Sequence, residues 1–253
     1  MKKEIHIFFT ALMFFTRIPC PKWVNHDPTY LRLSAKYFSL VGILVGSIGA
    51  FVFYVSSLLF SIEISLLLSM VSTIYTTGAF HEDGFADVCD GFGGGWTKDK
   101  ILLIMKDSRL GTFGSVGLML LLAIKFMALL EINPDYIPIA LIAGHSLSRF
   151  IATTLIYTHS YVRENDDSKA KPAAKHISLS MVIISGIFGI LPVFLFQNPW
   201  IFLALIPMYI SKVFLGVKFK KWIGGQTGDC AGAVQQLSEV VFYLSTIGLW
   251  KYI

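Results

Sequence analysis

The sequence predicts an all-α integral membrane protein with six to seven transmembrane helices and a short N-terminal interfacial or re-entrant helix. Hydrophobic residues make up 55% of the 253 residues and charged residues only 15%, and the mean hydropathy is +0.66. A soluble domain of this length is normally far less apolar. The apolar residues also gather in blocks of about 20, the length that a helix needs to cross a bilayer.

Seven apolar blocks are candidate transmembrane helices. They lie at about 37–60, 62–80, 113–131, 136–157, 177–197, 199–217 and 230–252. The last block is the weakest candidate because Gln235, Gln236 and Glu239 lie in its first half. Before them, residues 5–16 form an apolar run that is too short to span, so we expect an interfacial or re-entrant helix there.

Positive charge alternates between the segments that connect these blocks. Lys and Arg number six in residues 1–36, four in 81–112, four in 158–176 and three in 218–229, whereas 61–62, 132–135 and 198 carry none. By the positive-inside rule, the N-terminus and the three long loops face the cytoplasm. This topology and attraction to anionic lipid account for the net charge of +5, so we expect the lipid bilayer, and no nucleic acid, as a partner.

A single polytopic membrane domain over residues 1–253 accounts for the chain, because no repeat, low-complexity tract or appended soluble segment is visible. Its cytoplasmic motif loops lie at about 81–112, 158–176 and 218–229. The three cysteines all fall on the predicted cytoplasmic side, where we expect reduced thiols and no metal site. The oligomeric state is left open.

The stretch HEDGFADVCDGFGGG, residues 81–95, places four carboxylates within nine residues of an apolar chain. If the second block continues as a helix, Asp83, Asp87 and Asp90 fall at i, i+4 and i+7 and share one face. Like charges at this spacing repel, and a hard cation such as Mg²⁺ relieves the repulsion while keeping sites for water or phosphate. The alternative is a solvated loop whose acids improve solubility.

Two later motifs add candidate ligands for metal and phosphate. Asp107 is a candidate further metal ligand and Arg109 a phosphate-binding fork, with an interface anchor pair as the alternative. In GGQTGD, residues 224–229, a glycine-rich turn that includes Thr227 and Gly228 can offer N–H groups to a phosphate, and Asp229 a carboxylate to a metal. Glycine-rich turns between helices are ordinary, so this turn is weak evidence by itself.

Cationic residues near or within the fourth block are further candidates. His145 and Arg149 share one helix face, which we expect to point into the bundle or a polar cavity. Arg149 either binds phosphate or pairs with a buried acid. Arg163 follows the block on the next predicted cytoplasmic loop.

Four motifs together closely resemble the cobalamin synthase family, whose members are adenosylcobinamide-GDP ribazoletransferases. They are FFTRIPCP at 14–21, GAFHEDGFADVCDGFGGG at 78–95, IMKDSRLGTFG at 104–114 and GGQTGDCAGA at 224–233. The residues of these motifs, their order and their spacing all agree with the family, over nearly the whole chain.

The resemblance implies an Mg²⁺-dependent enzyme of the inner (cell) membrane that completes the nucleotide loop of vitamin B12. It would join α-ribazole or its 5′-phosphate to adenosylcobinamide-GDP, releasing GMP and forming adenosylcobalamin or its 5′-phosphate. The family motifs fall on His81, Asp83, Gly84, Asp87, Asp90 and Gly91, on Asp107, Ser108 and Arg109, and on Thr227, Gly228 and Asp229. Glu82 departs from the family pattern, in which an apolar residue is usual, and weakens any count of four ligands.

The chemistry needs positioning and charge neutralisation more than covalent work by the protein. We expect Asp83, Asp87 and Asp90, with Asp107 or Asp229, to bind one or two Mg²⁺ ions on the diphosphate. We expect Arg109, with Arg149 or Arg163, to stabilise the leaving GMP. The base for the ribose hydroxyl is His81 or one of the aspartates.

Two other functions fit parts of the sequence. A CDP-alcohol phosphatidyltransferase shares Asp87-Val-Cys-Asp90-Gly91, but Gly94-Gly95 stands where that family needs Ala-Arg, and its second acidic element is absent. A cation-coupled transporter would place its acids near the bilayer midplane and often carries inverted repeats. Here the acids lie in a predicted cytoplasmic loop and no repeat is apparent.

Overall fold

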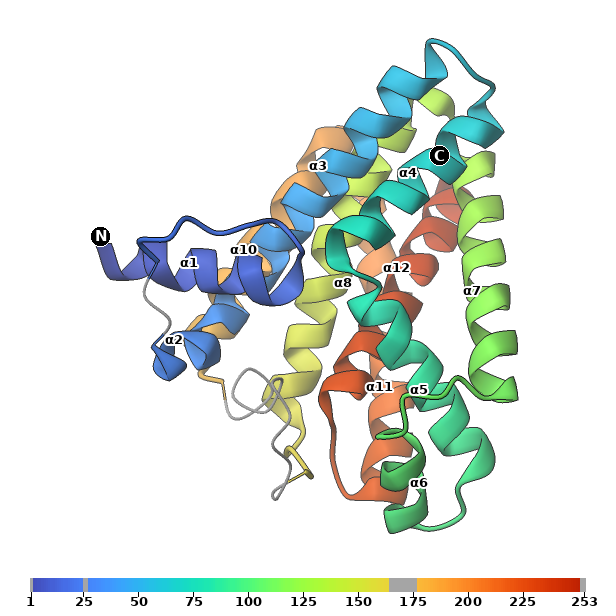
Figure 1. The fold of residues 1–253 in the computed structure, drawn as a ribbon. Helices are drawn as coiled ribbons and strands as arrows, with labels where there is room; N and C mark the ends of the chain where they lie inside the picture. Colours follow the sequence, from blue (N-terminus) through green and yellow to red (C-terminus); the bar gives the residue numbers. More distant parts are fainter. Residues whose placement is uncertain (1, 25–26, 164–176, 251–253) are drawn as a thin grey trace.

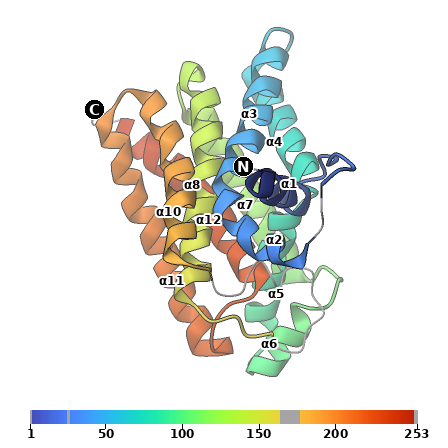
Figure 2. The same cartoon turned by 90° about the vertical axis from the view of Figure 1, so that its left-hand side faces the viewer.

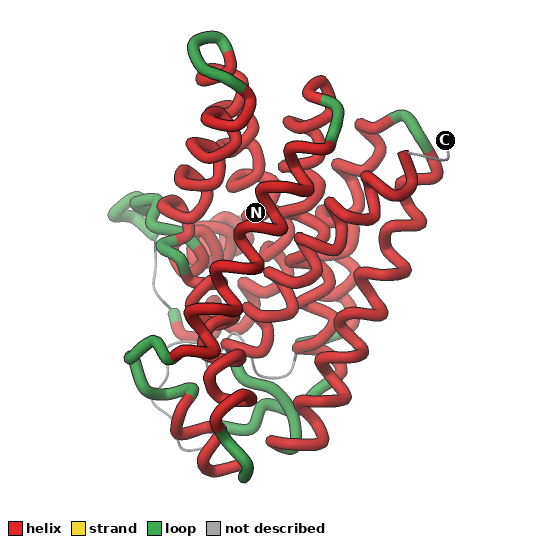
Figure 3. The backbone as a smooth tube through the Cα atoms, turned by 90° about the vertical axis from the view of Figure 1, so that its right-hand side faces the viewer, coloured by secondary structure: helices red, strands yellow, loops and turns green. Residues whose placement is uncertain are grey.

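The computed structural model describes residues 2–24, 27–163 and 177–250, and over these residues it contains helices and one isolated bridge (Figures 1 and 3). The prediction of an all-α membrane protein is confirmed. In chain order the α-helices are α1 (Lys2–Phe15), α2 (Pro28–Leu33), α3 (Phe38–Ser57), α4 (Ile62–Thr77), α5 (Phe80–Gly94), α6 (Lys98–Ile104), α7 (Thr112–Glu131), α8 (Ile137–Thr158), α10 (Leu179–Ile190), α11 (Leu205–Ile223) and α12 (Gly228–Trp250).

Five helical stretches are long and apolar enough to cross a membrane, and the bent pair α4–α5 makes a sixth if it counts as one span. The five are Thr29–Ser57, Thr112–Glu131, Pro134–Thr158, Leu179–Phe196 and Pro199–Ile223. The last predicted span forms one continuous helix, α12, of 23 residues. It is not among the five because it carries polar residues that are buried inside the bundle.

Helix α1 lies across the bundle instead of along it. It runs sideways in Figure 1 and is seen end-on in Figure 2 after a 90° turn. Its aromatic side chains pack on neighbouring segments, as Phe9 does on Trp23 with ring centroids 5.3 Å apart. This geometry agrees with the predicted interfacial or re-entrant helix at 5–16.

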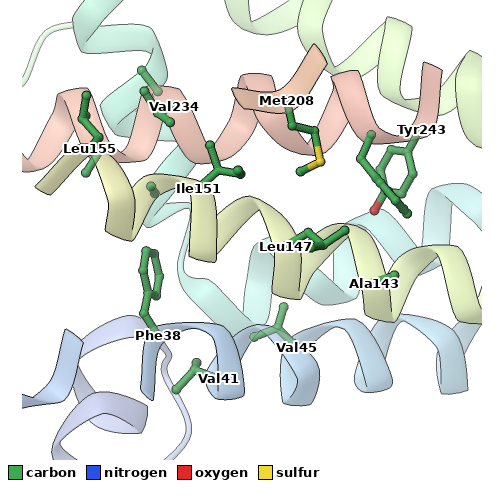
Figure 4. Packing of buried hydrophobic residues seen from close by; sticks show 14 of the residues in the cluster. Phe38, Val41, Val45, Ala143, Leu147, Ile151, Leu155, Met208, Val234 and Tyr243 are labelled. Carbon is green, nitrogen blue, oxygen red and sulfur yellow. The ribbon is translucent and has the colours of Figure 1, made fainter. Parts of the chain in front are cut away.

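Helix α8 is the centre of the bundle, between α3 on one side and α12 on the other (Figure 4). Gly42 and Gly46 of α3 form a small-xxx-small pair that allows the two backbones to approach closely. A Cβ added to Gly46 would stand 2.7 Å from the Cα of Ile142 on α8. Buried side chains such as Val41 and Leu147 fill the space on either side of this contact.

The chain breaks sharply between α4 and α5, with an 87° angle between the two helices. The second block does not run straight into the acidic stretch, but Asp83, Asp87 and Asp90 still lie on one helix, α5, at the spacing i, i+4 and i+7. Gly78 (φ 67°) and Ala79 (φ 57°) both adopt the left-handed conformation, which ends α4. The stretch predicted as a loop after residue 81 is itself helical, and the break turns this helix, α5, toward α12.

Candidate active site

Helices α5 and α12 touch at a point where both lack bulky side chains. A Cβ added to Gly84 of α5 would stand 3.0 Å from the Cα of Asp229, and one added to Gly232 would stand 3.3 Å from the carbonyl oxygen of His81. A side chain at position 84 would therefore force the two backbones apart by a few tenths of an ångström. The backbone contact at Gly84 brings the acidic turn of α5 against the first turn of α12, although the two lie far apart in the sequence.

Three carboxylates gather at this contact, and we call Asp83, Asp87 and Asp229 the acidic cluster. Asp83 is exposed, whereas Asp87 and Asp229 are half-buried. The negative charges of Asp229 and Asp83 repel that of Asp87, and Arg163 attracts it. The structure therefore unites residues from two separate sequence motifs in one electrostatic group.

Arg163 is held beside the cluster by a short backbone bridge. Tyr161 pairs with Gln226, and the Val162 N–H donates to the Gln226 carbonyl at 3.0 Å. An Arg163 guanidinium nitrogen then lies 3.1 Å from a carboxylate oxygen of Asp229. The predicted loop at 158–176 is described only as far as this residue, and its remainder lies outside the described residues.

The first turn of α12 is part of the acidic cluster, because it contains Asp229. Thr227 is fully buried, and its hydroxyl accepts the N–H of Cys230 at 3.3 Å, which caps the helix. Gly228 begins the helix. A helix N-terminus carries a partial positive charge and unpaired N–H groups, so it favours an anion such as phosphate.

Asp90, predicted as a metal ligand, has both carboxylate oxygens occupied by the protein itself. They accept the N–H groups of Gly111 at 2.7 Å and Gly114 at 2.8 Å. These two residues flank the start of α7, whose own N-cap residue makes no side-chain bond. Asp90 therefore caps α7 from α5, a role that its spacing from Asp83 and Asp87 does not reveal.

Asp107 and Arg109, also predicted site residues, bind each other at the surface. The guanidinium of Arg109 donates to Oδ1 of Asp107 at 3.1 Å and to Oδ2 at 2.6 Å. The hydrogen bonds from Arg109 lower the pKa of Asp107 below its ordinary value. The Arg109 side chain is 87% exposed. Asp107 and Arg109 thus form a pair with each other, as in the alternative to metal and phosphate binding. This pair has no contact with the acidic cluster.

His81, on α5, and Arg149, on α8, both lie inside the bundle. The His81 ring is 1% exposed and stacks on Phe38 with ring centroids 5.5 Å apart. Arg149 is equally buried, and its guanidinium lies over the same Phe38 ring. Arg149 also donates to the carbonyl of His145 at 2.8 Å.

A second charged group lies within the bundle, and we call Lys125, His145, Gln235, Glu239 and Tyr243 the core network. Lys125 and Glu239 form an ion pair at 2.5 Å, with both side chains at most 2% exposed. Tyr243 and Gln235 donate to the Glu239 carboxylate at 3.0 Å and 2.8 Å. Two of the three polar residues that made 230–252 a weak span candidate, Gln235 and Glu239, are part of this network.

Glu82, the departure from the family pattern, also points inward. Its carboxylate accepts a hydrogen bond from Gln236 of α12 at 2.9 Å, and it is 6% exposed. Sequence reasoning did not find this contact. The sequence feature that could have indicated it is a polar residue in each of the two segments, Glu82 in α5 and Gln236 in α12.

The acidic cluster fits a divalent cation that shares its coordination sphere with a ligand. Among the described residues, no three His, Cys, Asp or Glu side chains converge on one point as metal ligands. Mg²⁺ does not require three, because it is usually held by one or two carboxylates, with water and phosphate oxygens filling the other positions. Asp87 and Asp229, with Asp83 beside them, supply that donor set, and within the described part of the chain Arg163 is the cation that attracts Asp87 and pairs with Asp229.

Comparisons with known proteins agree over most of the chain. Residues 7–247 match the cobalamin-5-phosphate synthase family. The chain is 46% identical to the adenosylcobinamide-GDP ribazoletransferase of Shewanella frigidimarina, over 96% of this chain and 94% of that protein. It is 43% identical to the enzyme of the same name from Shewanella oneidensis, over 95% and 93%. No solved structure matches.

Proposed function

The chain belongs to the cobalamin-5-phosphate synthase family, and on this premise we propose that it is a membrane-embedded adenosylcobinamide-GDP ribazoletransferase that acts at the acidic cluster. The acceptor is α-ribazole or its 5′-phosphate, and the products are GMP and adenosylcobalamin or its 5′-phosphate. The observation that carries the placement of the site is the convergence of Asp87, Asp229 and Arg163 at the N-terminus of α12.

The reaction transfers the cobinamide-bearing phosphoryl group from GMP to a ribose hydroxyl. A ribose hydroxyl oxygen bonds to the phosphorus that carries the cobinamide arm, the bond from that phosphorus to the GMP oxygen breaks, and the hydroxyl proton leaves. Negative charge on the diphosphate opposes this attack, so fixed positive charge and alignment supply most of the rate.

Asp87 and Asp229, assisted by Asp83, would hold Mg²⁺ at this site. When bound, the ion supplies positive charge to the diphosphate oxygens. Asp90 is not included because two backbone N–H groups occupy it, and Asp107 is not included because its surface pair with Arg109 makes no contact with the acidic cluster.

The chain's own groups would orient the diphosphate. Arg163 offers a planar guanidinium next to Asp229, and the N-terminal N–H groups of α12 at Gly228 face the same place. Asp83 is exposed one turn before Asp87, so we assign it the hydroxyl proton. His81, the other candidate base, is buried inside the bundle at 1% exposure.

The charge pattern supports a cell-membrane protein with this site on the cytoplasmic side. The motif segments 81–112 and 218–229 carry seven of the Lys and Arg residues, and positively charged segments stay on the cytoplasmic side. Nucleotide substrates would then be available to the acidic cluster without crossing the membrane.

The family match does not favour the two alternatives. A phosphatidyltransferase would need its second acidic element, which the chain lacks. A transporter would bind its coupling ion near the middle of the membrane, whereas Asp229 lies in the first turn of α12 and Arg163 just beyond the end of α8.

GMP release tests the assignment and the site together. Protein in nanodiscs is given adenosylcobinamide-GDP and α-ribazole 5′-phosphate over a Mg²⁺ titration, and wild type is compared with Asp87→Asn. We expect wild type to release GMP and Asp87→Asn to lose at least about 100-fold in kcat/KM. Asp135→Asn is the matched control, because Asp135 is an exposed acid in the α7–α8 connection and should be as active as wild type.

The two parts of the proposal fail separately. Full activity of Asp87→Asn would remove the acidic cluster from the mechanism while leaving the reaction intact. Absence of GMP release from folded wild type with both substrates and Mg²⁺ would overturn the ribazoletransferase assignment itself.

A further inference from the structure

A groove on the side of the bundle lies between α7 and α11, and we propose that it binds an acyl chain of an anionic phospholipid whose phosphate meets Lys218. Helices α5 and α12 also line this lipid groove, whose volume is about 560 Å³. Ligand sites typically have about 300–1,000 Å³. The inference goes beyond the proposed reaction and does not depend on it.

The lining of the lipid groove is apolar and open to one side. Val88 of α5 and Ala233 of α12 are buried at its floor, whereas Phe113 and Val116 of α7 are 57% and 46% exposed at its rim. The two candidate spans that contain α7 and α11 are each only 28% buried inside the bundle. In a bilayer this face therefore meets lipid tails, which are as apolar as the lining.

The wall that α5 and α7 share is set by close packing of the two helices. A Cβ added to Gly117 of α7 would stand 2.7 Å from the Sγ of Cys89, and one added to Gly93 of α5 would stand 2.5 Å from the Phe113 ring. All four of these residues line the groove. The groove is therefore a shaped part of the lipid-facing surface.

Lys218 supplies the charge of the lipid groove. Its ammonium lies over the Phe92 ring, 5.6 Å from the ring centroid, and Phe92 packs on Phe219 with centroids 5.4 Å apart. Among the described residues that line the groove, none is Asp or Glu. A cation beside an apolar lining favours a ligand that has an apolar tail and an anionic head.

Lys218 also lies at the end of the bundle where a headgroup belongs. Gly93 is near the end of α5, Thr112 begins α7, and Lys218 is within two turns of the end of α11. These helix ends lie in the lower part of the bundle in Figure 1. Trp96 and Trp222, which follow α5 and end α11, are 81% and 37% exposed, and exposed Trp is typical of a bilayer surface.

The N-terminus of α7 borders the groove but is not available to a phosphate. Asp90 already accepts the N–H groups of Gly111 and Gly114, so a carboxylate of the protein stands where an anion would bind. Lys218 is therefore the group that distinguishes an anionic lipid from a neutral one.

Helix α5 separates the lipid groove from the acidic cluster. Phe85 and Phe92 line the groove and are two and nine residues after Asp83. At about 100° per residue, both project from the side of α5 opposite to Asp83. The groove is thus a site apart from the one assigned to the reacting diphosphate.

Lipid selectivity of Lys218→Gln is the first test. Affinities of the detergent-purified protein for dipalmitoyl phosphatidylglycerol and dipalmitoyl phosphatidylcholine are measured by native mass spectrometry. Wild type should bind phosphatidylglycerol about 5-fold more tightly, as expected for one Lys near an anionic headgroup, and Lys218→Gln should bind the two lipids equally. Lys220→Gln is the matched control, because Lys220 is exposed on the same helix outside the groove, and it should keep the wild-type preference.

Two results of this measurement would overturn the assignment of the headgroup. One is equal binding of the two lipids by wild type. The other is an equal loss of preference in Lys220→Gln and Lys218→Gln, which would show a diffuse attraction to the basic end of α11.

The thiol of Cys89 reports whether the lipid occupies the groove itself. Cys89 lines the groove, and Cys20, which is also a partly buried free thiol, does not. Phosphatidylglycerol at about 10 times its Kd should slow maleimide labelling of Cys89 about 10-fold by mass action and leave Cys20 unchanged. Binding of the lipid without protection of Cys89 would overturn the groove as its site.

Val116→Trp blocks the groove from its rim, where the new ring needs no space in the core. It should weaken the binding of both lipids and abolish the protection of Cys89 by lipid. Met119→Trp is the control, because Met119 is 64% exposed on α7 outside the groove, and it should behave as wild type. Both variants must keep the wild-type unfolding temperature in detergent without added lipid.

Two other occupants would each overturn the lipid assignment. Protection of Cys89 by adenosylcobinamide-GDP and not by phosphatidylglycerol would make the groove a substrate site. Cross-linking of Cys89 to its counterpart in a second copy would make it an interface between copies. Since lipid binding and thiol labelling need no turnover, their outcome is independent of GMP release.

Discussion

The acidic cluster and the core network both contain carboxylates, but the neighbours of these carboxylates differ. In the core network the carboxylate is paired with a cation, whereas in the acidic cluster the carboxylates repel one another. In the core network, Glu239 is fully buried and is met by Lys125, Tyr243 and Gln235. In the acidic cluster, Asp83 and Asp229 repel Asp87 at a half-exposed surface, and Arg163 pairs with Asp229 and attracts Asp87. In the part of the chain that the structure describes, Glu239 is therefore matched by close partners, whereas Asp87 lies among like charges.

This difference separates a structural role from a functional one. Charges inside a membrane bundle are costly unless they are paired, so the contacts of Glu239 are a condition for folding. Repulsion among Asp83, Asp87 and Asp229 opposes folding slightly, and a protein retains such repulsion where a bound cation relieves it. Removing a charge should therefore have opposite effects on stability in the two regions.

The largest expected effect is on the core network. Glu239→Ala leaves Lys125 buried without its partner, and breaking such a pair from one side costs about 3–5 kcal/mol. We expect a large fall in the thermal unfolding temperature in detergent and little folded protein.

The double variant Lys125→Met with Glu239→Gln sharpens this prediction. It removes both charges, and paired removal is far milder than breaking one side of the pair. The double variant should unfold at a higher temperature than Glu239→Ala. A double variant that is less stable than Glu239→Ala would mean that the two charges do not stabilise each other.

The acidic cluster should show the opposite pattern. Asp87→Asn removes the charge that Asp229 and Asp83 repel, so we expect the unfolding temperature to stay the same or rise, while kcat for GMP release falls about 100-fold to 1,000-fold. Both quantities are measured on one nanodisc preparation. A variant that loses stability in proportion to activity would place Asp87 among the structural residues, and the comparison between the two regions would fail.

The fold was largely predictable from the sequence because a bilayer limits the choice of structure. A run of about 20 apolar residues must form a helix that satisfies its own backbone, so most of the helix positions follow from composition. The break at Gly78 and Ala79 did not follow, since a non-glycine residue such as Ala79 in the left-handed region depends on tertiary contacts. Helix α12 was hard to place because its polar residues are satisfied by other helices.

The sequence predicted which types of residue form the candidate site, but it was less successful in predicting which individual residues lie together there. Helical spacing alone groups Asp90 with Asp83 and Asp87, yet Asp90 caps another helix through Gly111 and Gly114. Asp229 joins the cluster through a backbone contact at Gly84 that no local pattern encodes. Periodicity describes one helix, whereas the site depends on which two helices cross and where.

An ion pair at the surface, between Glu4 and Lys36, is a third charged contact to compare. Because it is exposed to solvent, it should contribute the least to stability of the three. Glu4 of α1 binds Lys36 and Tyr37, and its side chain is 50% exposed. Hydrogen bonds from Lys36 and then Tyr37 lower the pKa of Glu4 from its ordinary value of 4.5. A carboxyl group whose pKa falls on folding adds stability above its unfolded pKa and loses it as the pH falls through the folded value.

Glu4→Gln should therefore cost little at pH 7 and nothing in acid. An exposed ion pair is worth about 0.2–1 kcal/mol, so wild type should unfold slightly above Glu4→Gln at pH 7, and the difference should vanish as the pH drops below 4.5. The measurement is the difference in unfolding temperature between the two proteins at each pH. A difference that persists in acid would show that Glu4 holds α1 by packing and not by charge, and α1 would then resemble the core network more than a surface contact.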